Sequence, residues 1–332
     1  MDYRQPDGLL AKAKYGDGSI IGVIDSGITP ESASFADTGY GPPPSKWKGI
    51  CQVGPSFEAK SCNWKLIGAR WYVDDDVLNG MSEREILSPR DVEGHGTHTA
   101  STAGGNIVHN TSFLGLAAGT ARGGAPRARV AMYKACWSGF GCSSATVLKA
   151  MDDAVHDGVD VLSLSIGSSK EDVGTLHVVA NGISVVYSAG NDGPIAQTVE
   201  NSSPWLVTVA AATMDRSFPV AITLGNNEKF VAQSFVVLDT ASQFSEIQQY
   251  TDEDTVKGKI VFCYVGGQFN EQSTRLYIDV TMAVAAKGGR GVILPRFYTE
   301  SILQDDPLVT DLDIPFVPID YEIAQRIDQY IR

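Results

Sequence analysis

Short apolar runs alternate with segments of helical periodicity along much of the chain. Such runs predict strands that are buried on both faces, as in a parallel sheet; they cover residues 19–24, 130–133, 159–166, 183–187 and 205–211. Apolar residues recur at helical spacing over residues 144–157 and 174–181, and a glycine follows each predicted helix. The repeated order of strand, helix and strand predicts an α/β fold with a doubly wound parallel sheet and right-handed crossovers.

The last third of the sequence has a different pattern and predicts a second, small α/β domain over residues 226–332, after a first domain over residues 1–225. Its predicted strands and helices alternate, over residues 260–264, 272–287, 291–294, 314–319 and 321–331. Pro315 and Pro318 interrupt the last strand, which therefore favours an edge position. The final helix ends without a cap, so we expect this domain to be incomplete at residue 332.

Composition and charge exclude several classes of partner. With 332 residues, of which 43% are hydrophobic and 20% charged, the chain has the composition of a globular protein. Its net charge of -13 argues against nucleic acid and anionic membranes as partners. No apolar run is long enough to cross a membrane, and the polar start of the sequence does not resemble a signal peptide.

Two histidines stand three residues apart in the most distinctive stretch of the sequence, residues 91–104. His95 lies between Gly94 and Gly96, which leave the backbone free to approach another group closely. A zinc site is disfavoured because zinc-protease histidines stand four apart with an adjacent glutamate. Two interpretations stay open: a glycine-rich turn with two hydrogen-bonded histidines, or a general base, His95, that works with a carboxylate and a nucleophile elsewhere in the chain.

Asp25 and Asn191 are the candidates for partners of His95, because each comes shortly after a predicted buried strand. In open α/β sheets, functional groups collect at the carboxyl ends of the strands. Asp25 could orient the His95 ring and stabilise its charged form, and the amide of Asn191 could donate to an oxyanion. Turn chemistry is the alternative for both, since Asp-Ser-Gly and glycine-flanked asparagine are common in turns.

The cysteine spacing indicates an oxidising compartment. Cys51 and Cys62 bracket one short loop, and Cys136 and Cys142 bracket a shorter one. Neither spacing fits a zinc ribbon or a redox Cys-x-x-Cys motif, so we predict two local disulfides, the first contributing about 3 kcal/mol in the loop-entropy model. Five reduced, buried thiols are the alternative.

Three further features bear on the surface and the compartment of the protein. Residues 36–93 lack sustained periodicity and are predicted to form surface loops. Cys263 is expected to lie buried in a strand. Two sequons, at Asn110 and Asn201, are candidate glycosylation sites and favour secretion.

Three sequence blocks carry the candidate residues: Val23-Ile24-Asp25-Ser26-Gly27, Gly94-His95-Gly96-Thr97-His98-Thr99-Ala100 and Ser188-Ala189-Gly190-Asn191. In this order they resemble the subtilisin-like serine proteases. The segment over residues 114–126 and the segments around residues 47–51, 62 and 66–70 are similar to the plant subtilases in particular. The resemblance runs from about Gly18 to the end of the chain.

The resemblance implies a subtilisin-like fold and a serine endopeptidase that acts on polypeptide substrates. Asp25, His95 and Asn191 would be its orienting carboxylate, base and oxyanion donor, and His98 would be structural. The resemblance also implies substrate-binding residues, the first three of which pair with an extended peptide: Ser165, Ile166, Gly167, Ser188, Ala189 and Gly190. No metal and no other cofactor is expected.

Residues 226–332 resemble the protease-associated domain that plant subtilases carry inside their catalytic domain. Such a module could join two copies into a homodimer or act as a spacer. Together with the predicted disulfides and sequons, the resemblance implies a secreted, extracellular protein of the apoplast or cell wall.

One departure from the family pattern concerns the nucleophile. The family's serine stands in a Gly-Thr-Ser stretch beyond the inserted domain, and this sequence contains no Gly-Thr-Ser. We therefore expect an incomplete protease that ends before the serine and is inactive by itself. The alternative is a non-catalytic peptide-binding pseudo-protease or truncated gene product.

Overall fold

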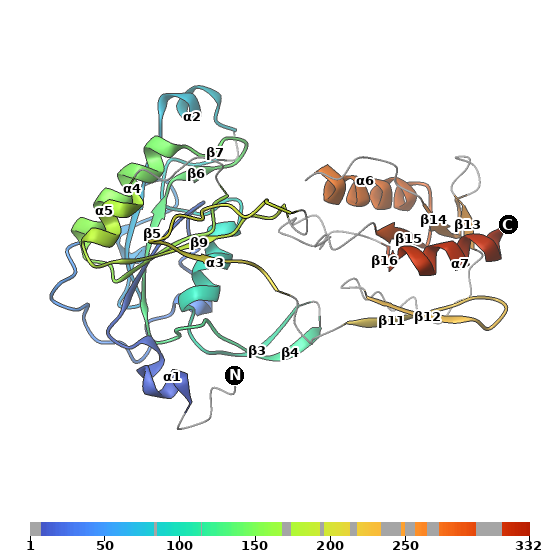
Figure 1. Ribbon diagram of the computed structural model, residues 1–332, viewed down its shortest axis with the longest axis horizontal. Helices are drawn as coiled ribbons and strands as arrows, with labels where there is room; N and C mark the ends of the chain where they lie inside the picture. Colours follow the sequence, from blue (N-terminus) through green and yellow to red (C-terminus); the bar gives the residue numbers. More distant parts are fainter. Residues whose placement is uncertain are drawn as a thin grey trace. The chain divides into compact units, whose positions relative to one another are not determined.

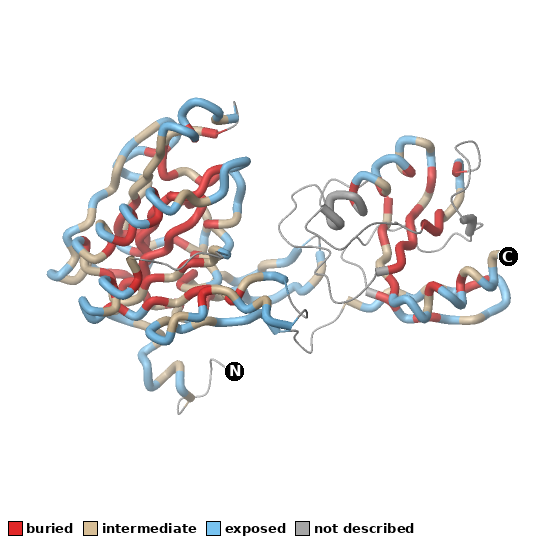
Figure 2. Tube along the Cα trace, turned by 45° about the horizontal axis from the view of Figure 1, so that its top comes forward, coloured by how far each residue is buried: buried red, intermediate tan, exposed pale blue. Residues whose placement is uncertain are grey.

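The computed structural model describes residues 8–82, 85–113, 115–167, 174–192, 196–212, 218–233, 247–249, 256–263, 272–296 and 314–332. The chain divides into two compact units, one over Met1–Ser112 and Ala117–Ala212 and the other over Phe113–Leu116 and Thr213–Arg332. Each unit has its own sheet and helices (Figure 1) and its own buried core (Figure 2).

A parallel sheet forms the centre of the first unit, and its described strands follow the order β10-β9-β8-β1-β5-β2. Their bounds are β1 (Ile20–Asp25), β2 (Leu66–Trp71), β5 (Arg129–Lys134), β8 (Val161–Leu164), β9 (Ser184–Ser188) and β10 (Val207–Val209). The parallel α/β sheet predicted from the apolar runs is therefore confirmed.

Helices cover both faces of this sheet, as expected for a doubly wound fold (Figure 1). The helices are α3 (His95–Gly104), α4 (Ser144–Asp157) and α5 (Thr175–Ala180). Successive side chains of a strand point to opposite faces. Ile20 and Ile24 of β1 accordingly join the core beneath α4 and α5, whereas Ile21 and Val23 join the core that contains Ala100 of α3.

Strand β2 corrects the prediction that residues 36–93 form only surface loops. It pairs in parallel with β5, starting at Leu66 opposite Val130. Leu66 and Ile67 are the only adjacent large apolar residues in this strand, Trp71 stands alone at its end, and the register shifts between Leu66 and Gly68. The apolar runs do not reveal this strand because Gly68, Ala69 and Arg70 interrupt its apolar sequence, although residues 66–69 are buried.

The first two hundred or so residues also form several short helices and strand pairs. They are α1 (Leu9–Lys12), α2 (Asp75–Gly80), and the paired strands β3 (Val108–Phe113) with β4 (Leu116–Ala121) and β6 (Cys136–Trp137) with β7 (Gly141–Cys142). In the part of the chain that the structure describes, no helix combines the length and the apolarity needed to cross a membrane.

The second unit has a parallel sheet in the order β13-β14-β15-β16 beside the antiparallel hairpin β11–β12. Its elements are β11 (Pro219–Thr223), β12 (Lys229–Gln233), β13 (Ile247–Gln249), β14 (Ile260–Phe262), α6 (Gln272–Ala286), β15 (Gly291–Arg296), β16 (Phe316–Asp320) and α7 (Tyr321–Ile331). The predicted edge position of the proline-containing strand is confirmed, because β16 ends the described sheet.

The hairpin explains why this unit begins before residue 226. Phe230 of β12 packs in one core with Phe262, Ile319 and Ile327 from the sheet and from α7. Sequence periodicity gave no sign of this contact, because the hairpin and α7 lie about 100 residues apart in the chain.

A fully buried lysine lies under the edge of the first sheet. The Lys65 side chain has no exposed surface, and its Nζ donates to Tyr40 Oη (2.8 Å), Pro126 O (2.9 Å) and Ala128 O (2.5 Å). These three acceptors are neutral. Burial, together with the nearby charges of Arg127 and Arg129, lowers the pKa of Lys65 to about 7.

We expect Lys65 to make the stability of the first unit pH-dependent. A lysine in the unfolded chain has a pKa near 10.4, so between pH 7 and 9 the unfolded state binds more protons than the folded state. The free energy of unfolding should therefore rise by about 2 kcal/mol over this interval because of Lys65. The Lys65→Met variant should lose that increment in urea titrations followed by tryptophan fluorescence, since all five tryptophans belong to the first unit. An equal pH dependence in both proteins would contradict it.

Candidate active site

Asp25 is the last residue of β1 and is almost completely buried, with 1% of its surface exposed. Its backbone oxygen accepts a hydrogen bond from Ala135 N (3.0 Å), which fixes it against the end of β5. The chain then turns at Gly27, whose φ of 123° is unfavourable for other residues. A Cβ at this position would lie 2.7 Å from Pro89 O, so the turn also needs glycine for space.

His95 begins α3, directly after Gly94 in the left-handed conformation. The start of this helix lies close against the turn that follows β1. A Cβ at Gly96 would be only 2.3 Å from Gly27 O, a separation that real Cβ atoms do not show. Gly96 therefore serves the close approach that the sequence predicted, and the approach brings the histidine to Asp25. Gly94 has open space where a Cβ would lie, and its positive φ of 103° is what favours glycine there.

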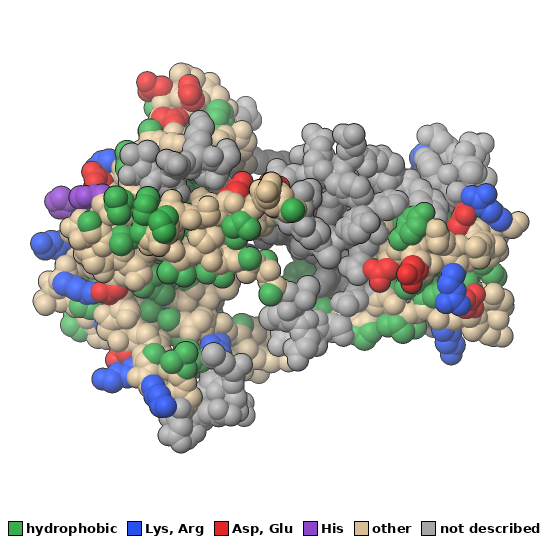
Figure 3. All heavy atoms as spheres, in the orientation of Figure 1, with side chains coloured by type: hydrophobic (Ala, Val, Ile, Leu, Met, Phe, Trp, Pro, Cys, Tyr) green, Lys and Arg blue, Asp and Glu red, His purple; other side chains and the backbone are tan. Residues whose placement is uncertain are grey.

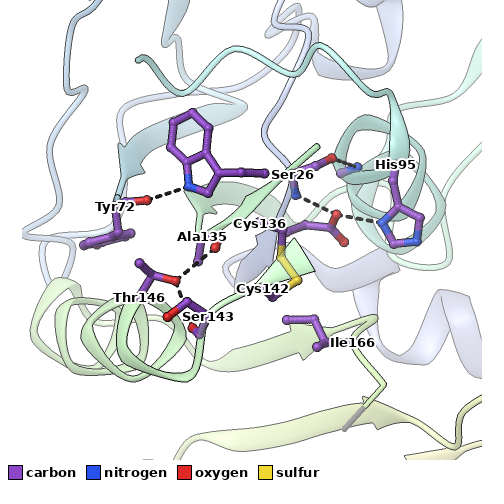
Figure 4. The surroundings of a disulfide bond; sticks show 12 residues. Ser26, Tyr72, His95, Ala135, Cys136, Cys142, Ser143, Thr146 and Ile166 are labelled. Carbon is purple, nitrogen blue, oxygen red and sulfur yellow. Dashed lines mark hydrogen bonds and ion pairs between the residues drawn. A yellow bond between two sulfur atoms is a disulfide. The ribbon is translucent and has the colours of Figure 1, made fainter. Parts of the chain in front are cut away.

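The carboxylate of Asp25 holds the His95 ring by one nitrogen. His95 Nδ1 lies 2.7 Å from Asp25 Oδ1, and the same oxygen accepts from the backbone N–H of Ser26 (2.7 Å). Asp25 Oδ2 accepts from Thr99 Oγ1 (2.9 Å), one turn further along α3. The carboxylate is thus fixed by three donors, and the His95 side chain remains 31% exposed. Figure 4 shows the ring extending from α3 toward the end of β1 with one nitrogen directed to the carboxylate.

A second carboxylate, Asp91, fixes the segment before α3 and was missed by the sequence analysis. Asp91 Oδ1 accepts from Ser26 Oγ (3.0 Å) and Gly94 N (2.8 Å), and Oδ2 accepts from both the N–H (2.8 Å) and the hydroxyl (2.6 Å) of Thr97. Ser26 Oγ in turn accepts from Gly96 N (2.8 Å). An acidic residue a few positions before a helix, with threonine in the first turn, is the local signal that could have indicated this arrangement.

Asn191 lies in the exposed loop that follows β9, at the same carboxyl edge of the sheet as Asp25. Only β8 separates β9 from β1 in the sheet. The structure therefore brings the asparagine to the predicted edge, while its role as an oxyanion donor stays a prediction. His98 is exposed on α3, and no group of three metal-ligating side chains occurs among the residues that the structure describes.

The two predicted substrate-binding segments lie side by side. Residues 165–167 follow β8 and residues 188–190 end and follow β9, its parallel neighbour. Ile166 O accepts from Ser188 Oγ (3.2 Å), which links the segments directly. Residues 165–167 follow the strand next to β1 and residues 188–190 end and follow the strand beyond it; whether they bind a peptide stays a prediction.

Both predicted disulfides are present, so the alternative of five reduced thiols is wrong. Cys51 and Cys62 are joined with an S–S distance of 2.03 Å, and Cys136 and Cys142 with 2.05 Å. The second bond closes the β6–β7 hairpin, which follows β5 and lies near the His95 and Ser26 end of the sheet (Figure 4). Cys263 is a free, buried thiol, as expected, but it directly follows β14 and is not part of a strand. Burial raises its pKa to about 11.

The two sequons differ in accessibility. Asn110 is exposed on β3. Asn201 is 9% exposed, and its side-chain nitrogen donates two hydrogen bonds. Figure 3, which shows one face of the molecule, has scattered apolar, acidic and basic side chains on the described surface of the first unit.

Residues 16–289 match the model of the subtilase family of peptidases. Two Arabidopsis thaliana proteins, subtilisin-like proteases SBT3.9 and SBT3.3, are 47% and 44% identical to this chain. Both alignments span 98% of this chain but only 45% and 46% of the relatives, so the chain spans less than half of their length. Among solved structures, the subtilisin-like protease Apa1 from the Antarctic psychrotroph Pseudoalteromonas sp. AS-11 is 15% identical with a TM-score of 0.42, over 95% of this chain and 75% of that protein.

Proposed function

Because this chain belongs to the subtilase family of serine peptidases, we propose that it supplies the aspartate and the histidine of a serine endopeptidase active site. The observation that supports the proposal most directly is the 2.7 Å contact between His95 Nδ1 and Asp25 Oδ1. A buried carboxylate on one ring nitrogen fixes the tautomer in which the other nitrogen, Nε2, can accept a proton. This arrangement suits a general base for an attacking hydroxyl.

In the proposed mechanism, His95 Nε2 takes the proton of a serine hydroxyl as the oxygen attacks the peptide carbonyl. Asp25 stabilises the imidazolium that forms, and His95 then returns the proton to the leaving amine. The amide of Asn191 donates to the oxyanion. The polypeptide substrate binds in an extended conformation along residues 165–167.

The nucleophilic serine of the family stands in a Gly-Thr-Ser stretch, and this sequence contains no such stretch. We propose that the 332-residue chain does not hydrolyse peptides alone and that the active peptidase is a longer protein that contains it. The same absence also supports a second candidate function, a peptide-binding protein without catalysis. A messenger RNA with an in-frame Gly-Thr-Ser after codon 332 would favour the peptidase, and an immediate stop would favour the binding protein.

Labelling with a serine-directed phosphonate tests the proposal. We expect no labelling of the 332-residue chain and stoichiometric labelling of a longer protein that includes the serine. The phosphonate reacts only with a serine that a neighbouring histidine activates, and the 332-residue chain has His95 but not the Gly-Thr-Ser serine. The His95→Ala variant of the longer protein is the control and should not react. Stoichiometric labelling of the 332-residue chain would overturn the proposal.

Three further properties belong to the same proposal. Secretion to the apoplast or cell wall is supported by the two disulfides and by the plant relatives. The predicted protease-associated domain over residues 226–332 is supported by the separate core of the second unit. Homodimerisation through that domain would be tested by sedimentation of the protein with and without it.

A further inference from the structure

Asn201 is buried where the substrate-binding segments meet, although its sequence context marks it as a glycan acceptor. Its side-chain nitrogen donates to Ile166 O (2.9 Å) and to Ser188 O (2.9 Å). Both amide protons are therefore used, one on the backbone that follows β8 and one on the last residue of β9. Only 9% of the residue is exposed.

The backbone of Asn201 is shaped for this contact. Its φ of 51° lies in the left-handed region, which asparagine adopts more readily than most residues. Its carbonyl oxygen accepts from the hydroxyl of Thr208 in β10. The preceding residue, Glu200, donates its N–H to Ala189 O (3.0 Å). One residue thus connects the carboxyl ends of β8 and β9 to β10.

We propose that Asn201 is a positioning residue that sets the spacing between residues 165–167 and residues 188–191, and that it carries no glycan. This inference rests on the proposed function, in which the first segment pairs with the substrate and the second carries the oxyanion donor. A glycan on the side-chain nitrogen would remove at least one of the two hydrogen bonds and would need space that a buried side chain does not have. The Ser188 hydroxyl also links the segments by donating to Ile166 O, but it forms only this one hydrogen bond between them, whereas Asn201 forms two.

Two substitutions distinguish a positioning role of this asparagine from a role as glycan acceptor. Ser203→Ala destroys the sequon Asn201-Ser202-Ser203 but leaves the Asn201 side chain intact. Asn201→Asp destroys both the sequon and the two donated hydrogen bonds, because a carboxylate cannot donate to carbonyl oxygens. If the residue mattered as a glycan acceptor, the two variants would behave alike.

The experiment uses the longer, secreted peptidase, with activity expressed per active site titrated by phosphonate so that misfolded protein is not counted. We expect Asn201→Asp to lower kcat about 10- to 100-fold with KM changed less than about threefold, since a displaced oxyanion donor weakens interactions made in the transition state. Ser203→Ala should match the unsubstituted protein. Mass spectrometry of glycopeptides should find Asn201 unmodified, with the exposed Asn110 as the comparison site.

The outcomes are distinguishable from a failure of the proposed function. An unsubstituted protein that neither cleaves peptides nor reacts with the phosphonate would refute the peptidase, and the mass spectrum would still report on Asn201. Glycan at Asn201, or an unchanged kcat in an active Asn201→Asp protein, would overturn the positioning role. If Asn201→Asp does not fold, Ser188→Ala is the second variant, because it removes the hydrogen bond from the Ser188 hydroxyl to Ile166 O. This variant should lower kcat about 3- to 10-fold, and an unchanged kcat would count against the proposal.

Discussion

Replacement of Asp25 by asparagine is expected to lower kcat about 10⁴-fold in a peptidase that contains this chain and a nucleophilic serine; the magnitude is the one found for catalytic triads of other serine proteases. Asp25 lies in contact with His95 Nδ1 and has almost no exposed surface. The neutral amide cannot stabilise the imidazolium that forms when His95 takes the proton. Water cannot replace the lost charge at a site that is this deeply buried.

Hydrolysis of a fluorogenic peptide at saturating concentration measures this effect. KM should change little, because Asp25 contacts the histidine and is buried away from the peptide. Asp152→Asn is a matched control, since Asp152 is an exposed carboxylate on α4, and it should keep kcat within about twofold. A loss of less than tenfold in Asp25→Asn would mean that the contact with His95 is structural.

Replacement of Glu85 by alanine is expected to destabilise the first unit by about 3–5 kcal/mol, because it leaves a buried ammonium group without its carboxylate. Lys134 Nζ lies 3.0 Å from Glu85 Oε2, and the two side chains are 0% and 2% exposed. The ammonium group would keep Arg90 O (3.0 Å) and the face of Trp137. Neither replaces an ion pair, and the N–H of Ser138 would also lose its acceptor, Glu85 Oε1.

Urea unfolding followed by tryptophan fluorescence measures this loss in the first unit. Lys149→Ala is the control, since Lys149 and Asp153 form an exposed ion pair one turn apart on α4, and its effect should stay below about 0.5 kcal/mol. A double variant, Glu85→Leu with Lys134→Met, should be more stable than Glu85→Ala because no charge remains buried. Equal effects of Glu85→Ala and Lys149→Ala would disprove the importance of the buried pair.

The arrangement of buried strands could be predicted because it depends on local composition. The strand that ends at Asp25 is apolar on both faces, and both faces are covered by helices in the structure. Helix α4 shows its apolar face in the sequence and ends at Gly158, which has a positive φ. The weaker signal of β2 was lost because Gly68, Ala69 and Arg70 interrupt its apolar run, although residues 66–69 are buried.

The candidate site was predicted in part for the same reason. Asp25 and His95 were chosen from their positions after a strand and within a glycine-rich stretch, and the structure joins them. Asp91 was not chosen and Asn201 was assigned another role, because the sequence does not show which distant groups they contact. The contacts from Asp91 to Ser26 and from Asn201 to Ile166 each join segments that lie far apart in the sequence.

The sequence by itself determined the parallel sheet, the helices on its two faces, the pairing of the cysteines and the choice of aspartate and histidine. Only the tertiary structure decided which polar groups are buried and what they touch: Lys65 among three neutral oxygens, Lys134 against Glu85, Asn201 between β8 and β9. Apolar periodicity records which side of an element faces inward. A buried polar group is defined by partners from distant segments, and these meet only when the chain is folded.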